Sequence, residues 1–210
     1  SKAAYSMAEK PILGVLCSGR GTNLEAIIAA IRSGQIPATI GVVLTDKPGV
    51  KALERAGKAG IPHAVIDRKA LAGREAFEEE LLAALKKYRV SFVILAGFMR
   101  ILSPRFVREY PGRILNTHPA LLPAFPGAHA HRDVLAYGVK VSGCTIHFVD
   151  EGTDSGPIIL QAAVPVKEDD TEETLAARVL VEEHRIYPRA IELCVKGKLR
   201  IEGRRVKILE

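Results

Sequence analysis

The sequence predicts an α/β protein whose open, mostly parallel sheet carries helices on both faces. Short apolar runs of strand length alternate with segments of helical spacing through the N-terminal half, the order found in βαβ units with right-handed crossovers. These runs are apolar throughout, as is typical of strands covered on both faces. The chain has 210 residues, 48% of them hydrophobic, and is therefore long enough to bury a sizeable core.

Strands and helices alternate regularly in the N-terminal half. The strands are expected at residues 11–17, 38–45, 63–67 and 91–96, and the helices at residues 23–31, 50–59 and 74–88. The last of these helices has the clearest pattern, because Phe77, Leu81, Leu82 and Leu85 fall on one face. We expect this face to pack on the sheet.

The pattern becomes less regular after Gly97. The expected elements are a short helix from Ser103-Pro104, strands at 113–118, 139–149 and 157–166, a long helix at 172–194 and a hairpin at 199–209 turning at 202–203. Three prolines between residues 119 and 126 predict a rigid irregular loop after the first of these strands. Pro188 is expected to kink or divide the long helix.

A single domain is predicted over residues 7–210, because no repeat, low-complexity tract or linker divides the chain. Residues 1–6 form a short polar lead, which we interpret as a non-native remnant outside the fold.

The net charge of +6 is unevenly distributed along the chain. Residues 196–207 hold six basic side chains against one acidic side chain, Glu202, so most of the excess belongs to this short segment. A charge run of this kind is usually a solvated face. The basic balance is therefore weak support for a nucleic-acid partner.

The cysteine count and the hydropathy pattern indicate the cellular compartment in which the protein is expected. Cys17, Cys144 and Cys194 are too few, and odd in number, for a disulfide framework, which favours a reducing compartment. No stretch approaches the roughly 20 apolar residues of a membrane helix. We expect a cytoplasmic protein with no membrane partner.

The first candidate site is the loop from Ser18 to Asn23, between a strand and a helix. Glycines let the backbone approach an anion, and free N–H groups at a helix N-terminus bind phosphate. The loop lacks both the nucleotide triphosphatase pattern and the third glycine of the dinucleotide pattern. Two interpretations stay open: an anion-binding turn, and a structural turn capped by Thr22 or Asn23.

The second candidate is the pair Asn116 and His118, at the end of a predicted strand. Side chains two residues apart in an extended chain point to the same side, and ligands of open α/β sheets bind beyond the carboxyl ends of strands. An amide beside an imidazole can stabilise an oxyanion while the imidazole handles a proton. The alternative is a pair of structural polar residues at a strand end.

The third candidate is the acidic loop from Asp150 to Gly156. Asp154 could orient His118 and favour its charged form. Asp150, Glu151 and Asp154 could also bind a metal, but carboxylates at this spacing are more often solvated turn residues. His129 and His131 lack further ligands at suitable spacing, so no metal site is predicted.

Four segments carry a resemblance to a known family. They are residues 18–24 (SGRGTNL), 95–103 (LAGFMRILS), 116–123 (NTHPALLP) and 147–157 (HFVDEGTDSGP). In this order and at these lengths they resemble the phosphoribosylglycinamide formyltransferases, folate-dependent enzymes of purine biosynthesis. The resemblance runs from about Ile12 to Lys207. It implies the formyltransferase fold, a Rossmann-like sheet followed by a C-terminal β-hairpin.

The resemblance also implies a role for each matching residue. The catalytic residues are Asn116, His118 and Asp154. The residues binding the ribonucleotide substrate are Gly21, Thr22 and Asn23 for its phosphate and Glu183 for its ribose hydroxyls. The residues binding folate are Arg74, Met99, Arg100, Ile101, Leu102, Asn116, Asp150, Glu151, Gly152, Thr153 and Asp154. The N-terminal half would then bind phosphate, and the C-terminal half would hold the folate and the catalytic residues.

The implied reaction moves a formyl group from 10-formyltetrahydrofolate to the amine of 5'-phosphoribosylglycinamide (glycinamide ribonucleotide). It passes directly through a tetrahedral oxyanion and needs no metal and no covalent enzyme nucleophile. The partners are these two small molecules, with no nucleic acid, and the chain is expected to be a monomer or a weak homodimer.

Other functions stay open. Methionyl-tRNA formyltransferases and formyltetrahydrofolate deformylases share the catalytic core, but the former have an added C-terminal domain and the latter an N-terminal regulatory domain. From a different class, the chain could be a non-catalytic module that binds sugar phosphates. A formyl-transfer assay distinguishes these possibilities.

Overall fold

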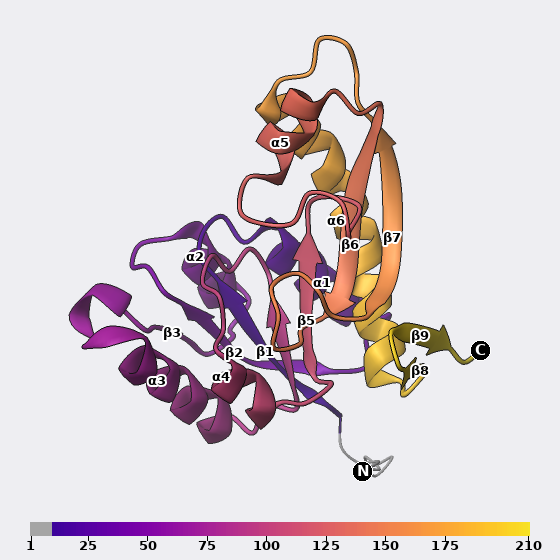
Figure 1. The fold of residues 1–210 in the computed structure, drawn as a ribbon. Coiled ribbons are helices and arrows are strands. Elements are labelled where there is room, and N and C mark those ends of the chain that lie inside the picture. Colours follow the sequence, from indigo (N-terminus) through magenta and orange to yellow (C-terminus); the bar gives the residue numbers. More distant parts are fainter. Residues whose placement is uncertain (1–9) are drawn as a thin grey trace. The chain divides into compact units, whose positions relative to one another are not determined.

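The computed structural model describes residues 10–210 (Figure 1). The chain divides after Phe98 into two compact units. The interpretation of residues 1–6 as a remnant lies outside the described residues, and the single domain over residues 7–210 stays a prediction.

The N-terminal unit is built on a parallel sheet. Its strands are β1 Ile12–Cys17, β2 Thr39–Thr45, β3 His63–Val65 and β4 Phe92–Leu95, in the order β3-β2-β1-β4. Their pairings β1–β2, β1–β4 and β2–β3 are all parallel. Because β4 returns to the far side of β1, the loops after these two strands meet, and the Ser18 N–H donates to the Gly97 carbonyl (3.1 Å). This is the switch point where open α/β sheets bind ligands.

The helices of this unit are α1 Thr22–Arg32, α2 Lys51–Lys58 and α3 Gly73–Lys87, with a 3₁₀ turn, η1 Arg68–Ala70. α1 contacts α2, and both α2 and α3 contact β2. Right-handed crossovers place α1 and α2 on one face and α3 on the other, because the crossover to β4 runs in the opposite direction. The apolar face predicted for α3 is buried at Phe77, Leu81, Leu82 and Leu85.

The C-terminal unit combines a mixed sheet with one long helix. Its strands are β5 Ile114–His118, β6 Val141–Phe148, β7 Ile158–Pro165, β8 Leu199–Glu202 and β9 Arg205–Ile208, in the order β5-β6-β7-β9-β8. Its helices are α4 Pro104–Glu109, α5 Ala130–Tyr137 and α6 Glu172–Val195. β5, β6 and β7 pair antiparallel, and α6 packs against all three (Figure 1).

Two features of the C-terminal unit differ from the sequence prediction. α6 runs without a break through Pro188, because the fully buried Tyr187, Ala190 and Ile191 hold this stretch in the core. The Tyr187 hydroxyl also donates to the Leu115 carbonyl (3.1 Å). The sequence pattern predicted no element at α5, which is eight residues long and buries Ala130 and Val134 alone.

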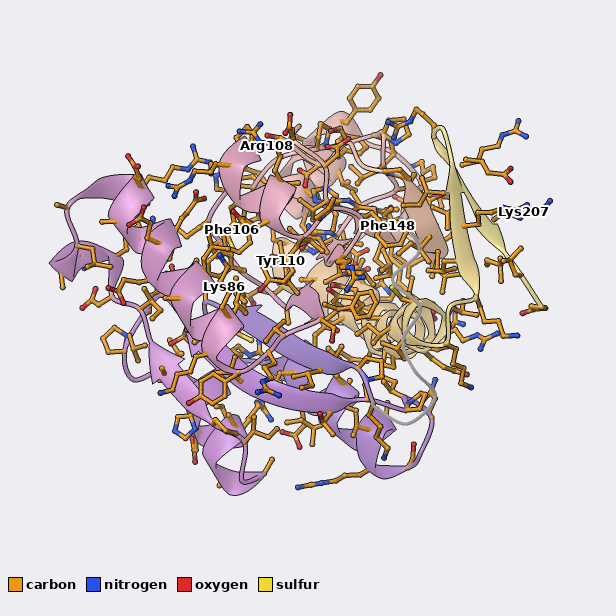
Figure 2. The ribbon with its side chains drawn as sticks, turned by 90° about the horizontal axis from the view of Figure 1, so that it is seen from below. Lys86, Phe106, Arg108, Tyr110, Phe148 and Lys207 are labelled. Atoms are coloured by element: carbon orange, nitrogen blue, oxygen red, sulfur yellow. The ribbon has the colours of Figure 1, made fainter. Side chains whose placement is uncertain are left out.

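The predicted basic hairpin forms at the C-terminus. β8 and β9 pair antiparallel around the turn Gly203-Arg204, one residue later than predicted. Figure 2 shows Lys207 projecting outward from this hairpin, which fits a solvated charge run. Between residues 10 and 210, no helix is long and apolar enough to cross a membrane.

Candidate active site

Four polar side chains share one face of the β5–β6 pair. In this antiparallel register Asn116 lies opposite His147, and His118 lies opposite Thr145. Directly opposed residues point to the same face, so the two cross-strand pairs form one polar patch. His118, Thr145 and His147 are all buried. The structure thus brings together Asn116 and His118, as predicted, and adds two residues from β6.

The His118 ring lies between two oxygen acceptors. Its Nε2 is 2.7 Å from the Phe125 carbonyl oxygen, and its Nδ1 is 3.6 Å from Asp154 Oδ2. A carbonyl oxygen only accepts, so Nε2 carries a hydrogen. A neutral ring would then turn a lone pair toward the Asp154 carboxylate, whereas an imidazolium offers an N–H to each acceptor. The two acceptors therefore fix the orientation of the ring within the polar patch.

Asp154 is held against the proline-rich loop. Its Oδ2 accepts a hydrogen bond from the Gly127 N–H (2.8 Å), and its backbone is left-handed, with φ 50°. A left-handed non-glycine residue is strained and is found mostly where the surroundings fix it. The strained backbone turns this carboxylate toward His118.

The rest of the acidic loop is organised by its own side chains. Asp150 Oδ1 accepts hydrogen bonds from the Gly152 N–H (2.9 Å) and the Ser155 hydroxyl (2.7 Å). Glu151 pairs with Arg108 of α4 (2.9 Å). These contacts shape the loop that carries Asp154, while Glu151, Gly152 and Thr153 are exposed. Their predicted contact with folate stays a prediction.

Thr145 anchors the loop that follows β5. Its hydroxyl donates to the Ala120 carbonyl (2.7 Å) and accepts from the Leu122 N–H (3.1 Å) and from Gln161 Nε2 (3.0 Å). Gln161 also donates to the Leu122 carbonyl (3.0 Å). The same loop contains the cis Leu122–Pro123 bond and leads to Phe125. The sequence pattern did not indicate this anchoring role of Thr145.

The predicted phosphate loop lies at the start of α1 in the N-terminal unit. Gly21 is the N-cap residue with a left-handed φ of 72°, and as a glycine it offers no side chain to cap the helix. The alternative interpretation placed the cap at Thr22 or Asn23, one or two residues after the observed N-cap. Binding of an anion by backbone N–H groups at this helix N-terminus stays a prediction.

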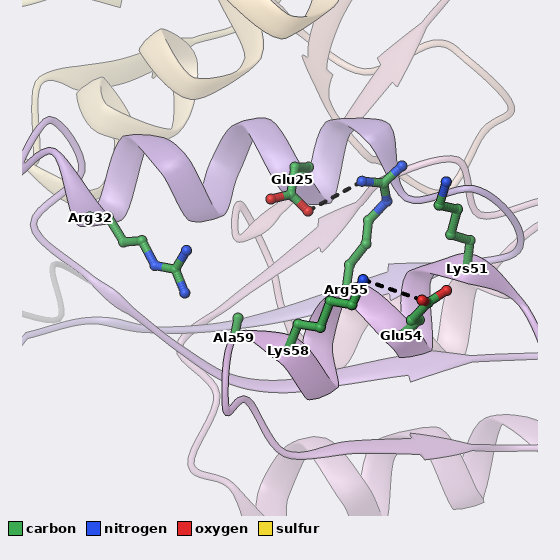
Figure 3. Close-up of a pocket in the computed structure, with 7 residues that line it drawn as sticks. All are labelled: Glu25, Arg32, Lys51, Glu54, Arg55, Lys58 and Ala59. Carbon is green, nitrogen blue, oxygen red and sulfur yellow. Dashed lines mark hydrogen bonds and ion pairs between the residues drawn. The ribbon is translucent and has the colours of Figure 1, made fainter.

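α2 supports this loop from behind. Arg55 Nε donates to the Arg20 carbonyl (2.8 Å), and a Cβ on Gly21 would lie 2.9 Å from Ala52. Only glycine therefore fits this position. Arg55 also pairs with Glu25 (3.3 Å) inside a groove of about 370 Å³ between α1 and α2 (Figure 3). The groove is lined by Glu25, Arg32, Lys51, Glu54, Arg55, Lys58 and Ala59.

Glu183 lies on the opposite side of β5 from Asn116 and His118. Its carboxylate accepts a hydrogen bond from the Thr117 hydroxyl (2.7 Å), and Thr117 alternates with the two catalytic candidates along the strand. Only 5% of Glu183 is exposed. The structure does not bring Glu183 into the polar patch, and its contact with ribose stays a prediction.

The predicted folate segment is largely exposed. Met99 and Ile101 are 63% and 67% exposed, whereas Leu102 is buried. Large exposed apolar side chains close together are typical of a ligand-binding surface. Arg74 lies in the N-terminal unit, where it pairs with the buried Glu78 (3.8 Å).

The three cysteines favour the thiol over the nucleophilic thiolate form. Burial raises the pKa of Cys17, Cys144 and Cys194 to about 12, so all three are protonated thiols near neutral pH. Within the described part of the chain, no group of three His, Cys, Asp or Glu side chains could hold a metal ion. An amide donor beside a histidine–carboxylate pair is an arrangement suited to stabilising a transient oxyanion.

The fold and this site define an α/β protein equipped for oxyanion chemistry at a strand end. The formyl transferase family model matches residues 13–191. The phosphoribosylglycinamide formyltransferase of Escherichia coli is 46% identical over 187 residues, which cover 89% of this chain and 88% of that protein. The chain therefore belongs to the formyl transferase family.

Two further proteins agree with this assignment. The trifunctional purine biosynthetic protein adenosine-3 of Drosophila pseudoobscura pseudoobscura is 52% identical over 190 residues, which cover 90% of this chain but 14% of that protein. The crystal structure of glycinamide ribonucleotide transformylase 1 from Symbiobacterium toebii superposes with a TM-score of 0.94 at 53% identity, covering 96% of this chain and 95% of that one. The predicted formyltransferase fold is confirmed.

Proposed function

We propose that this chain transfers the formyl group of 10-formyltetrahydrofolate to the amine of 5'-phosphoribosylglycinamide in purine biosynthesis. The observation that carries the proposal is His118, set between Asp154 and the Phe125 carbonyl with Asn116 on the same strand face. The names of the similar proteins from Escherichia coli and Symbiobacterium toebii support the choice of substrate.

The reaction proceeds by direct transfer. The ribonucleotide amine attacks the formyl carbon, the carbonyl π electrons move to oxygen, and a tetrahedral oxyanion forms. The Asn116 amide donates a hydrogen bond to this oxyanion, and the positive charge on His118 stabilises it. The oxyanion electrons then re-form the carbonyl as the carbon–nitrogen bond to folate breaks, and the folate nitrogen takes up a proton passed from His118 through a water. The extra proton of the former amine passes back through water to His118, which leaves a neutral amide and restores the enzyme. The products are the formylated ribonucleotide and tetrahydrofolate.

Asp154 acts through His118. Its carboxylate compensates the imidazolium charge and orients the ring while the Phe125 carbonyl holds the other nitrogen. The raised pKa values of the three cysteines support a route without a covalent enzyme intermediate.

Further residues bind the two substrates. Gly21, Thr22 and Asn23 hold the ribonucleotide phosphate through backbone N–H groups, and Glu183 contacts its ribose. Arg74, the segment 99–102 and the loop 150–154 contact folate, with the buried Leu102 acting through its main chain. The chain acts in the cytoplasm as a monomer or weak homodimer, and its three free thiols support a reducing compartment.

The proposal is tested by following the absorbance of the folate product with and without the ribonucleotide. We expect turnover only when both substrates are present. Turnover of 10-formyltetrahydrofolate alone would identify a deformylase, and binding of the ribonucleotide without turnover would identify a sugar-phosphate-binding module. Either result contradicts the proposal.

The oxyanion role of Asn116 gives a quantitative expectation. Removing one oxyanion donor typically costs about 10²–10³ in rate, so Asn116→Ala should lower kcat by that factor and change both KM values little. His118→Ala and Asp154→Ala should also lower kcat. Activity near that of the unaltered enzyme for the last two variants would exclude this mechanism. The exposed hairpin variant Lys207→Ala serves as a control.

A further inference from the structure

We propose that His147 is a positioning residue that fixes the orientation of the Asn116 amide for formyl transfer. The inference rests on the function proposed above, and it assigns a role to a residue that takes no part in the reaction derived so far. It follows from two contacts of the His147 ring, one with its own main chain and one with Asn116.

The first contact determines which nitrogen of the ring carries the hydrogen. His147 Nδ1 lies 2.9 Å from the Phe148 carbonyl oxygen, which can only accept, so Nδ1 is the N–H of the ring. In a neutral imidazole the other nitrogen, Nε2, then presents a lone pair. The ring is 2% exposed, so water does not compete freely for that lone pair.

The second contact orients Asn116. Its Nδ2 lies 3.4 Å from His147 Nε2, so one amide N–H points at the lone pair. The reversed amide would place Oδ1 against that lone pair, two acceptors face to face. Since the amide is planar, anchoring one N–H also sets the direction of the second one. That second N–H is the donor that the oxyanion requires.

The role depends on a neutral His147. Burial lowers the pKa of His147, and the nearby His118 lowers it further. The Phe148 carbonyl, Asp154 and Asp150 act in the opposite direction without reversing the shift. His147 therefore offers a lone pair to Asn116, whereas the proposed mechanism assigns the positive charge to His118. Protonation of His147 would turn Nε2 into a donor and release Asn116.

Two substitutions separate positioning from packing. His147→Phe keeps a buried ring but has no acceptor, and His147→Gln retains an oxygen near the position of Nε2. We expect His147→Phe to lower kcat at least tenfold, short of the about 10²–10³ for losing the donor itself, with both KM values within about twofold. His147→Gln should recover most of this loss. Ser142→Ala, another buried change on β6, should match the unaltered enzyme.

The pH profile distinguishes positioning from a structural role. In the unaltered enzyme, kcat should fall on the acid side as His147 takes up a proton, and this limb should be absent in His147→Gln. If His147→Phe matches the unaltered enzyme, or if His147→Gln keeps the same acid limb, the positioning role is wrong. An unaltered enzyme without formyl transfer would instead contradict the proposed function.

A measurement on the unaltered protein without substrates tests the positioning role of His147 without relying on activity or on the folding of any variant. Two-bond ¹H–¹⁵N NMR spectra of the histidine rings should show His147 as the neutral Nδ1–H form near neutral pH. A neutral Nε2–H form, or an imidazolium, would overturn the proposal, because neither leaves Nε2 able to accept from Asn116.

Discussion

Gly21 is the residue at which backbone geometry and the proposed binding of phosphate meet. Its left-handed φ and the closeness of Ala52 exclude any side chain. Gly21→Ala should displace the phosphate loop and weaken hydrogen bonds to a charged group, each worth about 1.5–3 kcal/mol. We therefore expect KM for the ribonucleotide to rise about tenfold or more, with kcat nearly unchanged, in steady-state kinetics.

Gly34→Ala is the matched control for this substitution. Gly34 also has a left-handed φ, 83°, but no atom lies within 4 Å of the Cβ that alanine would add. Both variants carry the same kind of backbone strain, and only Gly21→Ala moves the loop. Equal KM values for the two variants would show that the packing of Gly21 against α2 has no part in binding.

The residues of the site were predictable to different degrees. Asn116 and His118 could be paired from their spacing, because alternation along a strand is a local rule. The approach of Asp154 to His118 depends on a left-handed backbone and on the Gly127 N–H, neither of which leaves a local sequence signal. The pairing of Asn116 with His147 required the β5–β6 register, which is a property of the folded sheet.

Among the elements, β6 shapes the site because its Thr145 holds the loop after β5. Thr145→Val keeps the shape of the side chain but leaves the Leu122 N–H and the Ala120 carbonyl without their hydroxyl partner. A buried polar group without a partner costs about 1–3 kcal/mol. We expect a melting temperature lower by roughly 2–4 °C per kcal/mol, measured by thermal unfolding.

The same substitution should also lower kcat, since the loop carries the Phe125 carbonyl that holds His118. Thr39→Val, at the exposed start of β2, makes the same chemical change without these contacts and should leave both quantities unaltered. A Thr145→Val enzyme with normal stability and activity would show that other contacts suffice to hold the loop.

At the level of elements, the regular parts of the fold were the easiest to predict. The N-terminal strands and helices follow from apolar runs and helical spacing, because each buries a face that its own sequence displays. α5 was missed since little of it is buried, and α6 passes Pro188 because packing against β5 outweighs the lost helical hydrogen bond. Both outcomes depend on tertiary contacts.

For the whole molecule, buried titratable groups predict an optimum of stability between about pH 6.5 and 9. Burial lowers the pKa of His131, His147 and His184 below 6.5, so the unfolded chain binds more protons than the folded chain once the pH drops below that value. Stability must fall on this acid side. The three cysteines, whose pKa is raised from 9.0 to about 12, reduce stability above about pH 9 by the converse argument.

A further loss of stability is expected in stronger acid. Arg178 lowers the pKa of Asp170 well below its ordinary value, so this carboxylate resists protonation only in the folded chain. Urea midpoints measured across the pH range should therefore decline below about pH 6.5 and again below about pH 4. His184→Gln should flatten the first decline. A constant midpoint from neutral pH to pH 5 would contradict the assignment of neutral buried histidines.

The alternation of side chains along β6 also limits the insertions and deletions that this strand can tolerate. Thr145 and His147 point to one side of the strand, and Cys144 and Ile146 point to the other, against α6. Loss of a single codon within the strand would exchange the two sets and present a thiol and an aliphatic group where the chemistry needs a hydroxyl and an imidazole. Length variation among descendants of this sequence should accumulate in surface loops and spare this strand.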